Sequence, residues 1–86
     1  MNIVTLERDI HLFTLSDIAM IIEDDWSKVN YAARPYLDAM HTLQTLEDSY
    51  GLDSGLSIVL YFLSNANGWR GDVARCVKGE LRRRAK

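Results

Sequence analysis

The chain has 86 residues, of which 48% are hydrophobic and 26% are charged, and its formal net charge is −2. This length holds one small domain, residues 1–86, and is too short for two, while the composition is that of a globular protein rather than a disordered chain. The longest unbroken apolar run, Ile58 to Leu63, is far shorter than the roughly 20 residues that cross a bilayer, so no membrane partner is expected.

The single cysteine and the start of the chain bear on where the protein works. Cys76 excludes an internal disulfide and any zinc site built from paired cysteines. Charged residues appear from Glu7 onward, too early for the apolar stretch of a signal peptide. We therefore expect a cytoplasmic protein that folds in a reducing compartment.

Charge is segregated along the chain. Residues 1–66 hold ten acidic and three basic residues, whereas residues 67–86 hold seven basic and two acidic ones. Opposite charges divided in this way either attract each other within one folded unit or face a partner. We favour attraction within the fold.

The amino-terminal residues fit either of two structures. The spacing of Leu6, Ile10 and Phe13 permits a short helix that begins at Thr5. The same residues would also pair as an extended segment, which gives a short strand pair near the amino terminus.

A helix is predicted to begin near Leu15. Apolar residues recur from there to Val29 at three- and four-residue steps, which places them on one helical face. Either Ser16 or Thr14 would cap the first turn, and Asp17 lies favourably near the positive end of the helix dipole.

Pro35 marks the next helix, because a proline in the first turn has no amide hydrogen to lose. An apolar stripe then runs from Tyr36 to Tyr50, and Gly51 is a natural left-handed terminator. The pattern predicts one helix that extends to Tyr50.

Residues 56–63 are apolar on every side, with polar residues before and after them. A run this short fits either a buried helix or a buried strand. We favour a helix, because a strand would have few partners whereas the neighbouring helices offer faces to cover. This segment is expected to be the central element, buried all round.

The last helix is predicted to run from about Trp69 to Arg84, with Cys76 on its inner stripe and basic residues on its opposite side. The predicted fold is therefore all-α, a compact bundle of four to five short helices packed around residues 56–63. The alternative is an α+β fold with the short amino-terminal strand pair. The predicted core comprises Trp26, Met40, Leu43, Leu60, Trp69, Val73 and Val77.

No residue pattern indicates catalysis, so we expect no enzyme, no cofactor and no metal. A thiol on a core stripe is usually inert, and His11 and His41 belong to no recognisable nucleophile motif. Asp38 and His41 supply only two metal ligands, and the successive acids Glu23 to Asp25 point in different directions around a helix.

Three short motifs are interpreted as structural or coincidental. Residues 14–19 resemble the start of a helix-turn-helix unit, but the acids at residues 23–25 would repel a phosphate backbone. Residues 51–55 contain two glycines without the lysine of a phosphate-binding loop, and we interpret them as a turn between helices. The adhesion tripeptide at residues 70–72 is taken as coincidence.

The basic last helix is the better candidate for nucleic-acid binding. Several of its side chains would meet phosphates at once if they share one face. The alternative is a solvated helix surface. The candidate residues are Arg75, Lys78, Arg82, Arg83, Arg84 and Lys86.

A protein-interaction module or subunit is the favoured function. Small domains often gain stability by association, and this chain has two tryptophans, four tyrosines and an apolar third segment, so a homodimer is one form of the prediction. The rival is a nucleic-acid-binding accessory protein that uses the last helix. A third interpretation is that the acidic part of the chain, including residues 23–25, imitates nucleic acid.

The carboxy-terminal third offers one resemblance. FLSNANGWRGDVAR at residues 62–75, followed by Lys78 to Leu81, resembles small uncharacterised proteins that bacterial phages and other mobile elements carry. The resemblance implies a bacterial accessory protein. It implies no activity and no binding residues.

Overall fold

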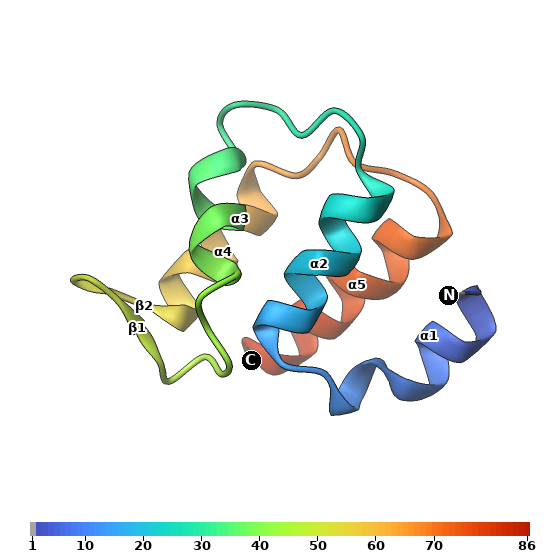
Figure 1. Cartoon of the computed structure of the whole chain (residues 1–86), viewed down its shortest axis with the longest axis horizontal. Helices are drawn as coiled ribbons and strands as arrows, with labels where there is room; N and C mark the ends of the chain where they lie inside the picture. Colours follow the sequence, from blue (N-terminus) through green and yellow to red (C-terminus); the bar gives the residue numbers. More distant parts are fainter. Residues whose placement is uncertain (1) are drawn as a thin grey trace.

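The computed structural model describes residues 2–86, and the predicted helical fold is confirmed (Figure 1). Within these residues the only strands form one antiparallel hairpin, in which Ser49 faces Ser54 and Tyr50 faces Asp53. This hairpin lies mid-chain and not near the amino terminus. The elements are α1 Ile3–Asp9, the 3-10 helix η1 Ile10–Leu12, α2 Leu15–Asp25, α3 Arg34–Met40, β1 Ser49–Tyr50, β2 Asp53–Ser54, α4 Gly55–Ser64 and α5 Asp72–Arg84.

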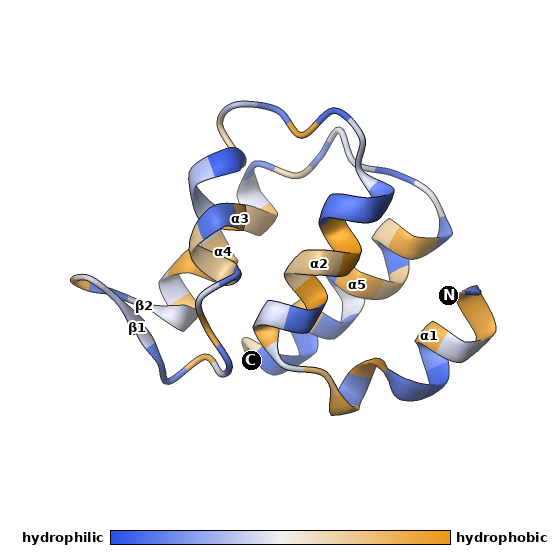
Figure 2. Ribbon diagram, viewed as in Figure 1, coloured by the Kyte–Doolittle hydropathy of each residue, from blue (hydrophilic) through white to orange (hydrophobic). Residues whose placement is uncertain are grey.

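The helices are grouped around two contacts. α2 packs on α5 in the centre of the molecule with α1 on one side, and α3 packs on α4 beside the hairpin (Figure 1). Most helices change between hydrophobic and hydrophilic stretches along the ribbon, as amphipathic helices around one core must, whereas α4 shows no strongly hydrophilic stretch (Figure 2). No helix in the described part of the chain has the length and apolar content needed to cross a bilayer.

Local side-chain caps fix the first two helices. α1 begins two residues before the predicted Thr5, because the Asn2 side chain accepts a hydrogen bond from the Thr5 amide at 2.9 Å. Of the two candidate caps for α2, Thr14 takes the role. The Thr14 hydroxyl accepts from the Asp17 amide at 3.0 Å, and the Asp17 carboxylate accepts from the Thr14 amide at 3.1 Å.

The prediction of one helix extending to Tyr50 is wrong, because α3 ends at Met40. The next carbonyls bond to α2 instead of continuing the helix. Leu43 accepts from the Ser16 amide at 2.8 Å and Gln44 accepts from the Leu15 amide at 3.0 Å. The Asp48 carboxylate then accepts from the amides of Gln44 and Thr45 at 2.8 and 3.1 Å, which stabilises a turn.

Gly51 has the predicted left-handed backbone, with φ of +61°, but it lies in the hairpin turn between β1 and β2. Residues 51–55 are therefore part of a hairpin and the start of α4, not a turn between two helices as predicted. At Gly55 the backbone of α4 approaches the preceding loop closely. An added Cβ would lie 2.7 Å from the carbonyl oxygen of Thr45 and 2.9 Å from that of Leu46, so this position requires glycine.

Residues 56–63 lie within the helix α4, so the prediction of a helix rather than a strand is confirmed. The prediction that this segment is buried on every side is wrong. Ile58, Val59 and Phe62 face the core, while Leu60 is 46% exposed and does not belong to the predicted core. Helical periodicity explains the difference, because positions 58, 59 and 62 share one face and position 60 falls on the opposite one.

The centre of the core is an aromatic cluster. Trp26 stacks on Trp69 with ring centroids 5.8 Å apart, and both rings meet the edge or face of Phe62 at 6.2 and 6.5 Å. Of the predicted core residues, Val73 is only partly buried, and five are buried: Trp26, Met40, Leu43, Trp69 and Val77.

Candidate functional site

Two of the six candidate nucleic-acid-binding residues are turned toward the protein. Lys78 Nζ donates hydrogen bonds to the carbonyl oxygens of Ala66 and Trp69, at 2.6 Å each. Arg84, whose side chain is only 16% exposed, donates to the Glu80 carboxylate at 2.6 Å and to the Ile10 carbonyl at 3.0 Å. These contacts hold α5 to the loop before it and to η1.

The other four candidates are exposed. Arg75 pairs with Asp72 in the first turn of α5, and Arg83 pairs with Glu80. The Arg75–Asp72 pair is exposed on both sides and contributes little to stability, whereas the carboxylate of Glu80 is buried; both guanidinium groups remain accessible. No ion pair within residues 2–86 engages the remaining two candidates, Arg82 and Lys86.

Arg70, which precedes the helix and is not one of the six candidates, lies near three of them in the fold. An open hollow of about 360 Å³ lies at the start of α5, between the helix and the loop that precedes it. Arg70, Arg75, Lys78 and Arg82 all line the hollow. Because Arg70 precedes the helix, its closeness to Arg82 depends on the turn at Gly71, which has φ of +110°.

Electrostatics show that these charges lie close together. The pKa of Lys78 is lowered, first because its ammonium is partly buried and then because Arg82 and Arg70 repel it. The pKa of Glu80 is lowered by its hydrogen bond to Arg83, with a further contribution from Arg84, despite the opposing effect of burial. Glu80 therefore neutralises the far end of α5 but not the hollow.

A second candidate surface is the outward side of α4, which we call the α4 face: Leu56, Leu60 and Tyr61. These side chains are 38%, 46% and 52% exposed. The Tyr61 ring stacks on Tyr36 of α3 with centroids 5.3 Å apart, so the α4 face continues toward α3. Residues 54–69 contain no charged residue and no histidine.

The hairpin that leads into α4 exposes further apolar side chains. Tyr50 is about half exposed and Leu52, in the turn, is fully exposed. Sequence reasoning missed the α4 face, because an all-apolar run gives no indication of which side meets solvent. Helical periodicity separates residues 56 and 60 from residues 58 and 62, but it does not say which of the two groups meets solvent.

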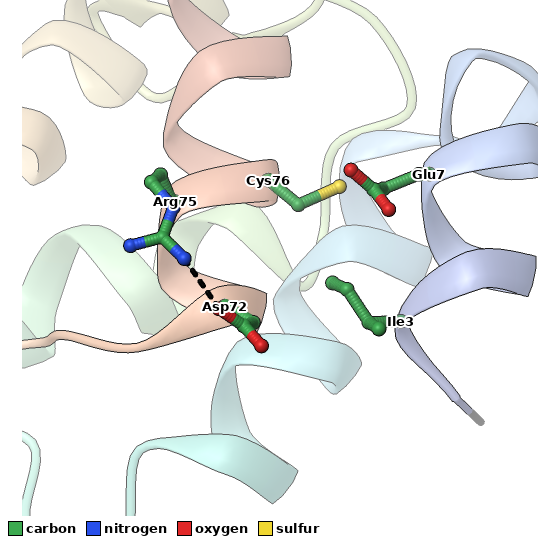
Figure 3. Close-up of a pocket in the computed structure, with 5 residues that line it drawn as sticks. All are labelled: Ile3, Glu7, Asp72, Arg75 and Cys76. Carbon is green, nitrogen blue, oxygen red and sulfur yellow. Dashed lines mark hydrogen bonds and ion pairs between the residues drawn. The ribbon is translucent and has the colours of Figure 1, made fainter.

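Cys76 lines an open hollow between α1 and α5, where its sulfur points toward Glu7 (Figure 3). The thiol is half-buried at the edge of the core rather than within it. Burial raises the pKa of Cys76, and the charges of Glu7 and Glu80 raise it further. Because the thiolate is the reactive form, this environment disfavours nucleophilic chemistry at Cys76.

The side chains that were considered as metal ligands and set aside, among them Glu23, Asp38 and His41, lie in an ion-pair cluster between α2 and α3. Arg34 donates hydrogen bonds to Glu23 and to Asp38, the latter at 2.8 Å, and His41 Nε2 lies 3.1 Å from Glu23 Oε1. The hydrogen bond from Arg34 is the main reason that the pKa of Glu23 is lowered. Across residues 2–86, no three His, Cys, Asp or Glu side chains converge as metal ligands would.

Neither a known motif nor a known relative accounts for this arrangement. α2 begins at Leu15, where the helix-turn-helix resemblance placed a helix, but residues 26–33 separate it from α3. This connection is longer than the typical turn of about three to four residues in such units. Comparison with protein-family models, with curated protein sequences and with solved structures finds no match for this chain, so its function is inferred from its own residues.

Proposed function

We propose that this protein is a non-enzymatic interaction subunit that forms a homodimer through the α4 face. The observation that carries the proposal is the exposure of Leu56, Leu60 and Tyr61 on one side of a helix that bears no charge. Leu56 and Leu60 lie one turn apart and form a ridge. Exposed apolar ridges of this kind are typical of helices that pack on another protein surface.

Charge favours a second copy as the occupant. Residues 1–66 hold ten acidic and three basic residues, so two copies that met through other surfaces of this part of the chain would bring like charges together. The α4 face is an exception, because residues 54–69 carry no charge that a second copy would oppose. A like pair of uncharged faces meets without unpaired buried charges.

The acidic hairpin favours one of the two arrangements that two-fold symmetry allows for a pair of α4 helices. In the antiparallel arrangement, which we propose over the parallel one, residue 56 of one copy approaches the carboxyl end of the other helix. Asp53, at the amino end of α4, then faces the uncharged residues that follow Ser64 and not its own equivalent. The arrangement thus keeps the acidic hairpins of the two copies apart.

The size of the face sets the expected strength. Three partly exposed side chains, with the hairpin residues Tyr50 and Leu52 beside them, form a smaller patch than the roughly 800 Å² per partner of a standard interface. We therefore expect a reversible dimer with a dissociation constant on the order of micromolar or weaker.

Sedimentation velocity over a concentration series tests the proposal, with Leu60→Glu as the disrupting variant. Met20→Glu is the matched control, because Met20 is an exposed apolar residue of α2, an element outside the α4 face. We expect the wild-type chain and Met20→Glu to dimerise with rising concentration and Leu60→Glu to stay monomeric. A wild-type monomer at the highest concentration, or equal loss in both variants, contradicts the proposal.

A further inference from the structure

The hollow at the start of α5 is lined by more positively charged side chains than acidic residues of the fold neutralise. Arg70, Arg75, Lys78 and Arg82 line it, while Asp72 is the only acidic residue within residues 2–86 that pairs with any of them. We propose that this hollow, together with the exposed basic row that continues along α5, binds the phosphate backbone of a nucleic-acid strand. The site is separate from the α4 face, so this inference goes beyond the proposed dimer.

Three of the four positive charges in the hollow, those of Arg70, Lys78 and Arg82, are not paired with a carboxylate within residues 2–86. Among residues 2–86, neither Arg70 nor Arg82 takes part in an ion pair. Lys78 is held in place by two carbonyl oxygens, which leaves one of its three N–H donors for another acceptor. An anion in the hollow would relieve the repulsion among these three groups and accept hydrogen bonds from them.

The amino end of α5 adds to this potential. No side chain caps the first turn of the helix, so its leading amides lack a side-chain partner and the helix dipole places partial positive charge there. Asp72 opposes it, because its exposed carboxylate lies in the same turn and pairs with Arg75. A bound phosphate must compete with Asp72 for this arginine.

The basic row along α5 favours a polymer over a single phosphate ion. Arg75 and Arg82 lie on the exposed side of the helix, about 10 Å apart at roughly 1.5 Å per residue, and the exposed Lys86 follows just beyond its carboxyl end. One phosphate ion fills only part of such a row, whereas a strand places successive phosphates along it. The affinity should therefore come from several phosphates together.

The site lacks the means to read bases. Trp69, the aromatic residue in the hollow, is only 2% exposed and is stacked on Trp26, so it offers no face to a base. Contacts from arginine and lysine to phosphates carry no sequence information. Binding is therefore expected to be independent of base sequence and strongly dependent on salt.

Fluorescence anisotropy with a labelled single-stranded DNA oligonucleotide over a range of salt concentrations tests the proposal. Neutralisation of phosphates by Arg70, Arg75, Arg82 and Lys86 predicts a dissociation constant on the order of 10⁻⁵ M at low salt and a log–log salt slope of about −3. The double variant Arg75→Glu with Arg82→Glu should bind at least roughly tenfold more weakly than the wild type. Its log–log salt slope should fall to about half.

The matched control is Arg8→Glu with Lys28→Glu, which changes net charge by the same amount at exposed residues outside the hollow. The control should bind as the wild type does, and circular dichroism should show that both double variants keep their helices. No binding at low salt, or equal loss in both double variants, overturns the proposal.

Two further probes distinguish the sources of phosphate. Inorganic phosphate should displace the oligonucleotide only at concentrations far above those of the strand. Vesicles of phosphatidylserine and phosphatidylcholine should compete poorly. Displacement by phosphate at concentrations comparable to those of the strand, or binding to the vesicles without binding to the oligonucleotide, overturns the assignment to nucleic acid. Leu60→Glu should leave oligonucleotide binding unchanged, which separates this result from the test of the dimer.

Discussion

Trp69 Nε1 donates a hydrogen bond to Asp25 Oδ2 at 2.8 Å, joining two residues that are 44 positions apart. Asp25 is the last residue of α2, and Trp69 lies in the loop that precedes α5. The bond therefore fixes the position of that loop, which contributes Arg70 to the basic hollow. Asp25, one of the acidic residues that the third interpretation assigns to a nucleic-acid mimic, is instead engaged in this structural hydrogen bond.

Asp25→Ala should destabilise the protein, because it leaves a buried indole N–H without its acceptor. The expected loss is about 1–2 kcal/mol in the free energy of unfolding, measured by urea denaturation followed by tryptophan fluorescence. Asp25→Asn keeps an acceptor oxygen at this position and should lose less. Equal stability of the alanine variant and the wild type would show that the bond contributes nothing.

Gly55→Ala should destabilise the protein by about 1–3 kcal/mol, because the new Cβ meets the backbone of Thr45 and Leu46. The matched control is Gly79→Ala in α5, where nothing lies within 4 Å of the added Cβ. That variant should gain about 0.5–1 kcal/mol from helix propensity. Urea denaturation measures both, and the same sign for the two changes would contradict the account of Gly55.

The lowered pKa of Glu80 determines how this residue's contribution to folding stability depends on pH. The pKa of Glu80 is lowered in the folded protein, mainly by its hydrogen bond to Arg83, so the folded state binds its proton more weakly than the unfolded state does. The stability that this group contributes is complete above the ordinary glutamate value of 4.5 and is lost as the pH falls through the folded value.

Glu80→Gln should therefore cost about 2 kcal/mol at neutral pH, because hydrogen bonds from two arginines lose their charged acceptor. The difference from the wild type should shrink as the pH falls below 4.5. Thermal melting as a function of pH measures this, with the exposed Glu47→Gln as the control. A difference that stays constant down to strongly acidic pH would show that the charge of Glu80 is not responsible.

Asp72→Asn should strengthen binding of the oligonucleotide, because it removes the carboxylate that competes with phosphate for Arg75. Since exposed ion pairs contribute at most about 1 kcal/mol, the expected gain is roughly twofold to fivefold. The anisotropy titration at low salt measures it. Weaker binding by Asp72→Asn would mean that Asp72 helps to orient Arg75 for the ligand.

Several elements could be predicted from local patterns. The start of α2 at Leu15 followed from periodicity, and the choice of a helix for residues 56–63 followed from the lack of strand partners and the presence of neighbouring helices to cover. The end of α3 at Met40 did not, because the carbonyls of Leu43 and Gln44 bond to the amides of Ser16 and Leu15, far away in the chain. Long-range backbone hydrogen bonds of this kind leave no trace in hydrophobic periodicity.

The basic site was predictable as charge but not as geometry. The sequence shows six basic residues in or just after the last helix. The side chain of Arg84, however, donates a hydrogen bond to the carbonyl of Ile10, which is 74 positions away. Lys78 is likewise held by carbonyls of the preceding loop, while Arg70 from that loop enters the hollow. Which basic side chains remain accessible to a ligand depends on tertiary contacts that only the folded chain reveals.

The central claim is that the α4 face is the surface through which two copies meet. Its most direct test is a dilution series of the isotope-labelled chain followed by amide chemical shifts in two-dimensional NMR. The account predicts concentration-dependent shifts concentrated in residues 54–64, including Leu56, Leu60 and Tyr61. Spectra that do not change on dilution, or shifts that concentrate on α1 instead, would contradict it.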